Sequence, residues 1–188
     1  MSNTTLRALG LALVATIAVA CGSAAPAGPP SAPASAPPAT FAEYDAAFCG
    51  AFTSLIRAVG NPDAGTPSVL SKKLDDAVRA GDALAGDQAA AAMTAELETG
   101  RRHAATAARW QRAAAAMAQM DRLLVAFEAM TTAKRAVAAK VPGAPDPQQA
   151  FEQAGGVDAW AGTLSGVSAL PIPSGAVPAP CKAMTGTL

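Results

Sequence analysis

From Gln88 to Val141 the chain contains no proline and a single glycine, Gly100. Proline and glycine are the residues that most often end helices, so their scarcity favours helix almost throughout this stretch. Apolar residues also recur here at steps of three and four, the period of one face of a helix. The recurring residues are Met93, Leu97, Ala104, Ala107, Trp110, Ala114, Met117, Met120, Leu124, Phe127, Met130 and Val137.

One unbroken helix over this stretch would be about 80 Å long at a rise of about 1.5 Å per residue. The two helices expected before it are each nearer about 28 Å and could not cover it. We therefore expect a break, either at Gly100 or between Trp110 and Ala113. The second position is favoured, because Gly100 would divide the stretch very unequally.

A first helix is predicted from Phe41 to Val59. Thr40 and Glu43 form a capping-box pattern, in which each side chain satisfies a backbone donor near the helix start. Gly60 and Asn61-Pro62 then end the helix. Its apolar stripe consists of Phe41, Tyr44, Phe48, Phe52, Leu55 and Val59.

Two further helices are predicted from Thr-Pro and Asp-Pro pairs, which are typical of an N-cap followed by the first helical position. One starts at Thr66-Pro67, is weakened by Gly81 and ends at Gly86-Asp87. Its inner face is expected to carry Leu70, Leu74, Ala77, Val78 and Leu84. The other starts at Asp146-Pro147, is weakened at Gly155-Gly156 and ends before Pro171. Residues 171–188 are expected to form an extended, proline-rich tail.

Composition supports an all-α fold. Alanine, which has the highest helix propensity, makes up about a quarter of the chain, and aromatic residues make up 4%. The sequence predicts an antiparallel bundle of four to five helices over residues 41–188, closed by one disulfide. The formal net charge is zero, so there is no electrostatic argument for a nucleic-acid partner.

The N-terminal segment has the order of an export signal. Arg7 precedes an apolar run from Ala8 to Ala20 that is too short to span a bilayer, and small residues lead up to Cys21. We therefore interpret residues 1–20 as a signal peptide. Residues 21–40 would follow as a spacer of mainly Ala, Pro, Ser and Gly, whose extended length would reach roughly 60 Å at about 3.1 Å per residue.

Ala18-Val19-Ala20-Cys21 resembles the lipobox of bacterial lipoprotein precursors. The resemblance implies that Cys21 is acylated, becomes the first residue of the mature chain, and anchors it to the outer face of a bacterial membrane. The same residues also fit the small-x-small rule of ordinary signal peptidase, which would cut at the same bond and release a secreted protein.

The number of cysteines favours the lipoprotein interpretation. The chain has three, Cys21, Cys49 and Cys181, and an exported protein meets oxidising conditions in which an odd thiol needs an explanation. If Cys21 carries lipid, Cys49 and Cys181 can pair. That bridge would fasten the tail to the first helix, and loop entropy alone would contribute roughly 4 to 5 kcal/mol.

Few residues suggest catalysis or a cofactor. His103 is the only histidine, too few for a ferritin-like di-iron site, and we interpret it as a surface or groove-lining residue. Asp121 and Glu128 lie on one helical face and are interpreted as an ordinary polar stripe.

Four arginines lie near one another in the sequence and could receive an anion: Arg101, Arg102, Arg109 and Arg112. A Glu98–Arg102 pair would partly neutralise this group. Four methionines could bind Cu(I) through their sulfur atoms. Methionine at helical spacing is more often a core residue, so core packing is the favoured interpretation. The four are Met93, Met117, Met120 and Met130.

The sequence thus favours a non-enzymatic binding or interaction module of the cell envelope without a cofactor, anchored through lipid on Cys21. Its partner would be an envelope protein or a small ligand. The alternative is carriage of a small ligand or copper within the bundle, and catalysis ranks third.

Intact-mass analysis of the mature protein tests the anchor. The wild-type chain should begin at Cys21 and exceed its polypeptide mass by that of the acyl groups. A Cys21→Ser variant should lose the added mass and leave the membrane fraction. A mature wild-type chain that begins with an unmodified Cys21 would contradict the lipoprotein interpretation.

Overall fold

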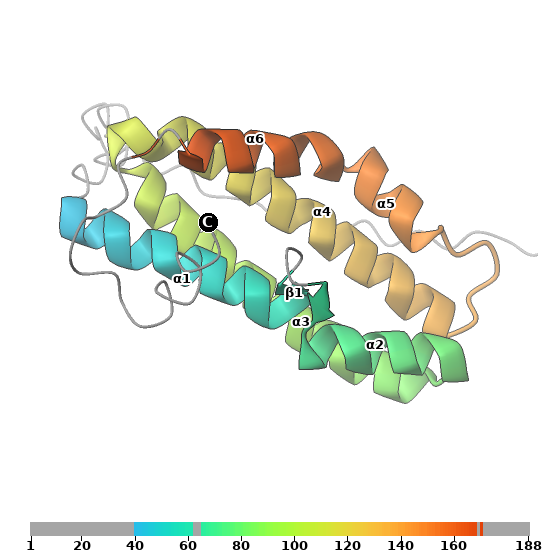
Figure 1. The fold of residues 1–188 in the computed structure, drawn as a ribbon. Coiled ribbons are helices and arrows are strands. Elements are labelled where there is room, and N and C mark those ends of the chain that lie inside the picture. Colours follow the sequence, from blue (N-terminus) through green and yellow to red (C-terminus); the bar gives the residue numbers. More distant parts are fainter. Residues whose placement is uncertain (1–39, 62–64, 169, 171–188) are drawn as a thin grey trace, which may run out of the picture. The chain divides into compact units, whose positions relative to one another are not determined.

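A computed structural model describes residues 40–61, 65–168 and 170. The described part is mostly helical, with two very short strands (Figure 1). The elements are α1 (Phe41–Val59), β1 (Gly60–Asn61), β2 (Thr66–Pro67), α2 (Val69–Ala80), α3 (Ala83–Ala108), the 3-10 turn η1 (Gln111–Ala113), α4 (Ala114–Ala138), α5 (Pro147–Gln153) and α6 (Gly156–Ser168). The all-α prediction is confirmed.

The start of α1 is the predicted capping box. The backbone N–H of Thr40 donates to the Glu43 carboxylate (2.7 Å), and the backbone N–H of Glu43 donates to the Thr40 hydroxyl (3.3 Å). The first of these bonds lowers the pKa of Glu43, and its side-chain bond with Thr40 and the charge of Arg109 add to the effect. The helix ends at Val59, as predicted, with Gly60 at a φ of 113°.

The predicted start of the second helix is wrong by two residues. Thr66 and Pro67 form β2, which pairs antiparallel with Gly60 and Asn61 of β1. Ser68 is the N-cap: its hydroxyl accepts from the Ser71 N–H (2.9 Å) and donates to the Ala58 carbonyl (2.6 Å). Ser68 is the N-cap in place of Thr66, and its hydroxyl bonds both to the first turn of α2 and to the end of α1.

The predicted end of that helix is wrong as well. Gly81 ends α2 in the left-handed conformation (φ 62°), and the Asp82 carboxylate caps α3 by accepting from the Ala85 N–H. Gly86 does not end a helix; it is buried inside α3, where it contacts α4. Leu84, expected on an inner face, is 69% exposed. A tight helical hairpin at Gly81-Asp82 therefore replaces one longer helix.

The favoured break in the long stretch is confirmed. Helix α3 ends at Ala108, Trp110 is extended (φ −79°, ψ 109°), and η1 leads into α4. Gly100 lies within α3, where a Cβ would be 3.2 Å from the Ser54 Cβ and 3.3 Å from Leu124. Its role is close helix packing, which explains a glycine that does not interrupt the helix.

The last predicted helix is present but divided. Asp146 caps α5, with Pro147 in its first turn, as predicted. Gly155 (φ 77°) then separates α5 from α6. The described part therefore has six α-helices instead of the four to five expected. The predicted tail, residues 171–188, lies outside the described residues, as do the predicted signal peptide and most of the spacer.

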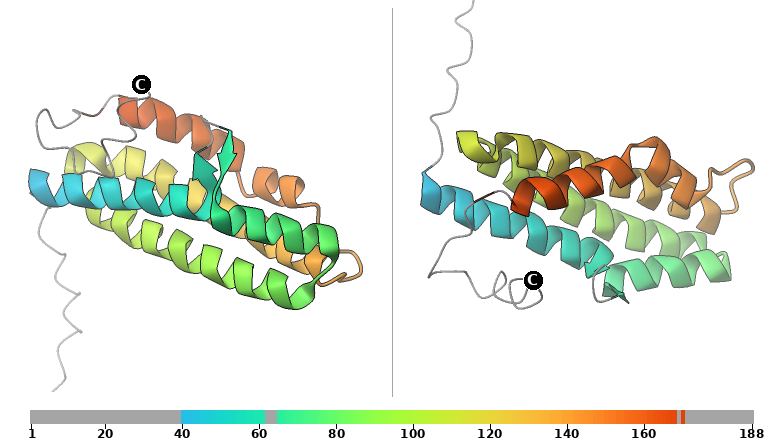
Figure 2. Two further views of the ribbon diagram at one scale, coloured as in Figure 1. Left: turned by 60° about the horizontal axis from the view of Figure 1, so that its bottom comes forward. Right: turned by 45° about the horizontal axis from the view of Figure 1, so that its top comes forward.

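Helix α3 is the centre of the packing. It packs against α1, α2 and α4, and α4 packs in turn against α2, α5 and α6. Helix α2 continues from the end of α1 in roughly the same direction, so together they cover the length of α3 (Figure 2). Two apolar clusters result. The main one is formed largely by α1, α3 and α4, and the smaller one comprises Leu74, Ala89, Ala90 and Met93, with Leu70 at its edge.

Small residues bring these helices close together. A Cβ at Gly50 of α1 would lie 2.7 Å from the His103 ring of α3, and one at Gly86 of α3 would lie 2.7 Å from the Ala138 Cβ of α4. A Cβ at Gly166 of α6 would lie 2.9 Å from the Ala116 Cβ of α4. These distances are shorter than carbon atoms tolerate, so any larger residue at these positions would force a neighbouring group to shift.

A Gly86→Val substitution tests this packing. The new side chain would collide with Ala138 and should destabilise the protein by about 1–3 kcal/mol, the usual effect of overpacking. Urea unfolding followed by circular dichroism measures the change. The control is Ala105→Val on the exposed side of α3, which should cost less than about 1 kcal/mol through helix propensity alone. Equal effects of the two substitutions would contradict the close contact.

Candidate interaction surface

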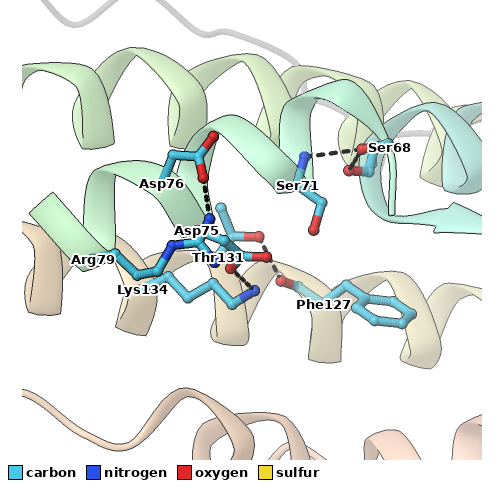
Figure 3. A network of polar contacts seen from close by, with 9 residues as sticks. Ser68, Ser71, Asp75, Asp76, Arg79, Phe127, Thr131 and Lys134 are labelled. Atoms are coloured by element: carbon cyan, nitrogen blue, oxygen red, sulfur yellow. Dashed lines mark hydrogen bonds and ion pairs between the residues drawn. The ribbon is translucent and has the colours of Figure 1, made fainter. Parts of the chain in front are cut away.

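A groove of about 480 Å³ runs between α2 and α3. Helix α4 contacts the other side of α2, where Lys134 Nζ is 2.6 Å from Asp75 Oδ1 (Figure 3). The groove is therefore an outer furrow of the α2–α3 hairpin. Its lining residues are Leu70, Lys73, Asp76, Ala77, Ala80, Asp82, Ala85, Gln88, Ala89 and Ala92.

The floor of this groove is apolar and firmly supported. Ala77 and Ala89 are buried, and Ala89 belongs to the smaller core cluster with Leu74 and Met93, both fully buried. A floor that is continuous with the core cannot easily collapse or rearrange. Alanine side chains also leave the furrow wide enough for another chain segment to approach the helix backbones.

The rim of the groove carries both charges. Asp76 accepts from Lys72 (2.8 Å) and from Arg79, and these bonds lower the pKa of its carboxyl. Lys73 and Asp82 add one charge of each sign, so the rim has no strong overall preference for an anion or a cation.

A second groove of about 480 Å³ lies between α3 and α4 and is more polar. Arg135 Nε is 2.6 Å from Asp87 Oδ1 across it. Thr131 and Thr132 also line it, but their hydroxyls donate to the Phe127 and Glu128 carbonyls within α4. Because Arg135, Asp87 and both threonine hydroxyls already have hydrogen-bond partners, this groove is the weaker candidate for a binding surface.

The carboxylates interpreted as a polar stripe have a specific role. Arg101 Nε donates to Asp121 (2.9 Å), and Arg101 Nη1 lies 3.7 Å from Glu128. The hydrogen bond with Asp121 raises the pKa of Arg101, and the charges of Asp121, Glu128 and Glu98 add to it. Asp121 and Glu128 thus join α4 to α3, which spacing within one helix could not reveal.

The predicted arginine group is divided among different contacts. Arg101 turns to α4, and Arg102 donates to the Thr99 hydroxyl (2.8 Å), in place of the expected pair with Glu98. The Arg109 charge acts on Glu43 at the start of α1. Arg112 is exposed in η1. These separate environments give little support to a shared anion site.

His103 and the methionines lie in packing positions. The His103 ring is half-buried against Gly50 of α1. Met117 and Met120 are buried in the main core cluster, whereas Met93 is buried in the smaller one. Met130 is half-buried. Met93 thus belongs to a different cluster from Met117 and Met120, an arrangement that favours packing over a common metal centre.

Of the three cysteines, Cys49 is described. It lies in α1 and is 6% exposed. Cys21 and Cys181 lie outside the described residues, so the lipid on Cys21 and the Cys49–Cys181 bridge stay predictions. Within residues 40–61, 65–168 and 170, no three His, Cys, Asp or Glu side chains gather as a metal site would require. Over the same residues, every helix is too short or too polar to cross a membrane.

Comparison of the chain with protein-family models, curated proteins and solved structures gives no match. The candidate surface therefore stands on its geometry alone. Sequence reasoning missed the groove, although its alanines recur at steps of three and four. That pattern also describes a helix face turned toward the core, and the two cases differ only in what packs against the face.

An aromatic contact closes the end of the bundle where α1 begins. The ring of Tyr44 lies 4.4 Å from that of Trp110, centre to centre, and Tyr44 is 2% exposed. Burial, with a smaller effect from Asp45, raises the pKa of Tyr44 to about 12. This contact links the first turns of α1 to the break between α3 and α4.

Because Tyr44 is the only tyrosine, absorbance at 295 nm reports its ionisation alone. The folded protein should titrate near pH 12, and the protein unfolded in guanidinium near the ordinary value of about 10. Since folding raises this pKa, the associated stability is complete below about pH 10 and is lost as the pH rises toward 12. A folded-state transition near pH 10 would contradict the buried contact.

Proposed function

We propose that the protein is an exported lipoprotein whose helical domain is a non-enzymatic binding module of the cell envelope. We further propose that the α2–α3 groove is its interaction surface. The observation that carries the proposal is an alanine floor, continuous with the core, beneath a rim of mixed charge. Lipid on Cys21 and the extended spacer would hold this module away from the membrane.

An amphipathic helix is the partner segment that best fits such a furrow. Two antiparallel helices present a groove into which the apolar face of a third can pack. Alanines at positions 77, 80, 85, 89 and 92 would allow the backbones to approach closely. Lys73 stands on the rim where it can pair with an acidic group that flanks the apolar face of the incoming helix. Asp76 is already bonded to Lys72 and Arg79, and Asp82 caps α3.

The charged residues outside the groove also support binding rather than catalysis. Arg101 binds Asp121, Lys134 binds Asp75, and Arg135 binds Asp87. Each pair joins two helices, so these groups serve to hold the bundle together. General acid–base catalysis would need a carboxylate or cation with a tuned pKa in a cleft.

Carriage of a small ligand is the alternative. The volume of the groove, about 480 Å³, lies within the range of small-molecule sites, about 300–1,000 Å³. Native mass spectrometry of the purified protein separates the two functions. A bound small molecule that is lost when the groove is filled would favour carriage, and a chain without one would favour the protein partner.

Filling the groove tests the proposal directly. An Ala92→Arg substitution places a long charged side chain over the floor and should weaken partner binding at least about tenfold, equivalent to about 1.4 kcal/mol. Photocrosslinking from position 85 in intact cells identifies the partner, and titration with the purified partner measures the affinity.

The matched control is Ala105→Arg, on an exposed part of α3 away from the groove. This variant should bind as the wild type does, and both variants should retain the wild-type helix content. Equal affinities of the Ala92 and Ala105 variants would place the interaction surface elsewhere.

A further inference from the structure

Two large apolar side chains stand exposed at the rim of the α2–α3 groove. Val69 is 71% exposed and precedes the lining residue Lys73 by about one turn of α2. Leu84 is 69% exposed and precedes the lining residue Gln88 by about one turn of α3. Residues one turn apart lie on the same face of a helix, so both side chains widen the apolar surface of the groove. Exposed apolar side chains that gather in one place are typical of a surface that another molecule covers.

Helix α6 carries an apolar ridge on its outer face. Val157 and Leu164 are 57% and 48% exposed, and Ala161 between them is exposed as well. Their spacing of four and then three positions places them on one face of the helix, and we call them the α6 ridge. The opposite face, which includes Ala159 and Thr163, is buried, and α6 packs on α4. The α6 ridge is therefore the apolar face of this helix that its own bundle leaves open.

The ridge and the groove match in length and in shape. Two helical turns separate Ala85 from Ala92 along the groove, and two turns separate Val157 from Leu164 along the ridge. Each surface thus extends about 11 Å, at about 5.4 Å per turn. The groove is a furrow floored by alanine, and the ridge is one side of a helix with a small residue between two larger ones. A furrow between two antiparallel helices accommodates a helix face of this shape.

Free charges of opposite sign accompany the two surfaces. Asp76 and Asp82 of the groove already have partners within the hairpin. Lys73 takes part in none of the ion pairs among the described residues. On α6, Asp158 is exposed beside Val157, and the ion pairs of the described part of the chain do not include it either. The groove thus offers a free ammonium group, and the ridge is flanked by a free carboxylate.

The two surfaces lie on different sides of the bundle. Helix α4 packs against both α2 and α6, and Figure 1 shows it between them. The groove lies on the outer side of the α2–α3 hairpin, and the ridge lies on the side of α6 that faces away from α4. The α6 helix of one chain therefore cannot enter its own groove, whereas that of a second copy can.

We propose that the groove binds the α6 ridge of a second copy of this chain, so that the protein self-associates. This inference rests on the proposed function of the groove and identifies its partner helix. Lys73 of one copy pairs with Asp158 of the next, and the apolar rim of the groove packs beside the ridge. Because each copy uses its groove for one neighbour and its ridge for another, the contact joins copies head to tail.

Sedimentation velocity of the purified protein from about 1 μM to about 1 mM tests the proposal. The wild type should form species of increasing size as its concentration rises. Ala92→Arg blocks the groove and Ala161→Arg blocks the ridge, so each variant alone should need at least about tenfold higher concentration to associate. The control is Ala105→Arg, an exposed position of α3 outside both surfaces, which should associate as the wild type does.

Mixing the two blocked variants separates this contact from other modes of association. The Ala92→Arg chain keeps its ridge and the Ala161→Arg chain keeps its groove. An equimolar mixture should therefore form one-to-one pairs that cannot extend further. Circular dichroism should show wild-type helix content for each variant. A mixture that stays monomeric where the wild type associates would overturn the proposal, since another surface would then join the copies.

Charge reversal tests the pairing of Lys73 with Asp158. Lys73→Glu and Asp158→Lys should each weaken association several-fold, because each change places like charges opposite one another. A chain with both substitutions should recover wild-type association, since every contact again joins opposite charges. A double variant that associates more weakly than either single variant would overturn the proposed contact.

Failure of this inference and failure of the proposed function give different results. Photocrosslinks from position 85 to an α6 peptide, formed between two differently tagged copies in intact cells, would support both. A wild type that stays monomeric to about 1 mM and crosslinks from position 85 to a different protein would overturn self-association and keep the groove as the interaction surface. A monomeric wild type without any crosslink from position 85 would overturn both.

Discussion

The close approach of α3 to its neighbours is the contact on which the rest of the structure depends. Gly50, Gly86 and Gly100 each stand where a Cβ would collide with, or press against, a neighbouring helix. An alanine-rich helix buries little apolar area per residue, so its packing must come from short distances between backbones. A domain with so few aromatic side chains is stabilised mainly by this density of contact.

The hairpin formed by α2 and α3 follows from the same constraint. Gly86 lets α3 approach α4 beside Ala138, and the turn at Gly81-Asp82 returns the chain so that α2 covers the adjoining part of α3. One side of α2 then faces α4, where Asp75 binds Lys134, and the other side forms the wall of the groove. The candidate interaction surface is thus the side of the α2–α3 hairpin that α4 does not cover.

Charged residues complete the bundle at its surface. The pairs of Arg101 with Asp121 and Arg135 with Asp87 join α3 to α4, and their side chains are 40–58% exposed. Exposed pairs of this kind contribute little each, typically about 0–1 kcal/mol. Their main effect is to set the register of the helices, which the apolar core, made largely of similar small side chains, specifies less sharply.

Local signals in the sequence determined much of this protein. The capping box at Thr40 and the cap at Asp146 were predictable, because each depends on residues within one turn of helix. The break after Ala108 was predictable for another reason: an unbroken helix would be too long for its neighbours to cover. The sequence alone also supports the export signal and the predicted pairing of Cys49 with Cys181. Only the tertiary structure decided that Gly86 lies inside a helix, that Ser68 rather than Thr66 caps α2, and that Asp121 and Glu128 bind Arg101. These features depend on which helices meet, and in an alanine-rich chain the inner and outer faces of a helix carry the same residue.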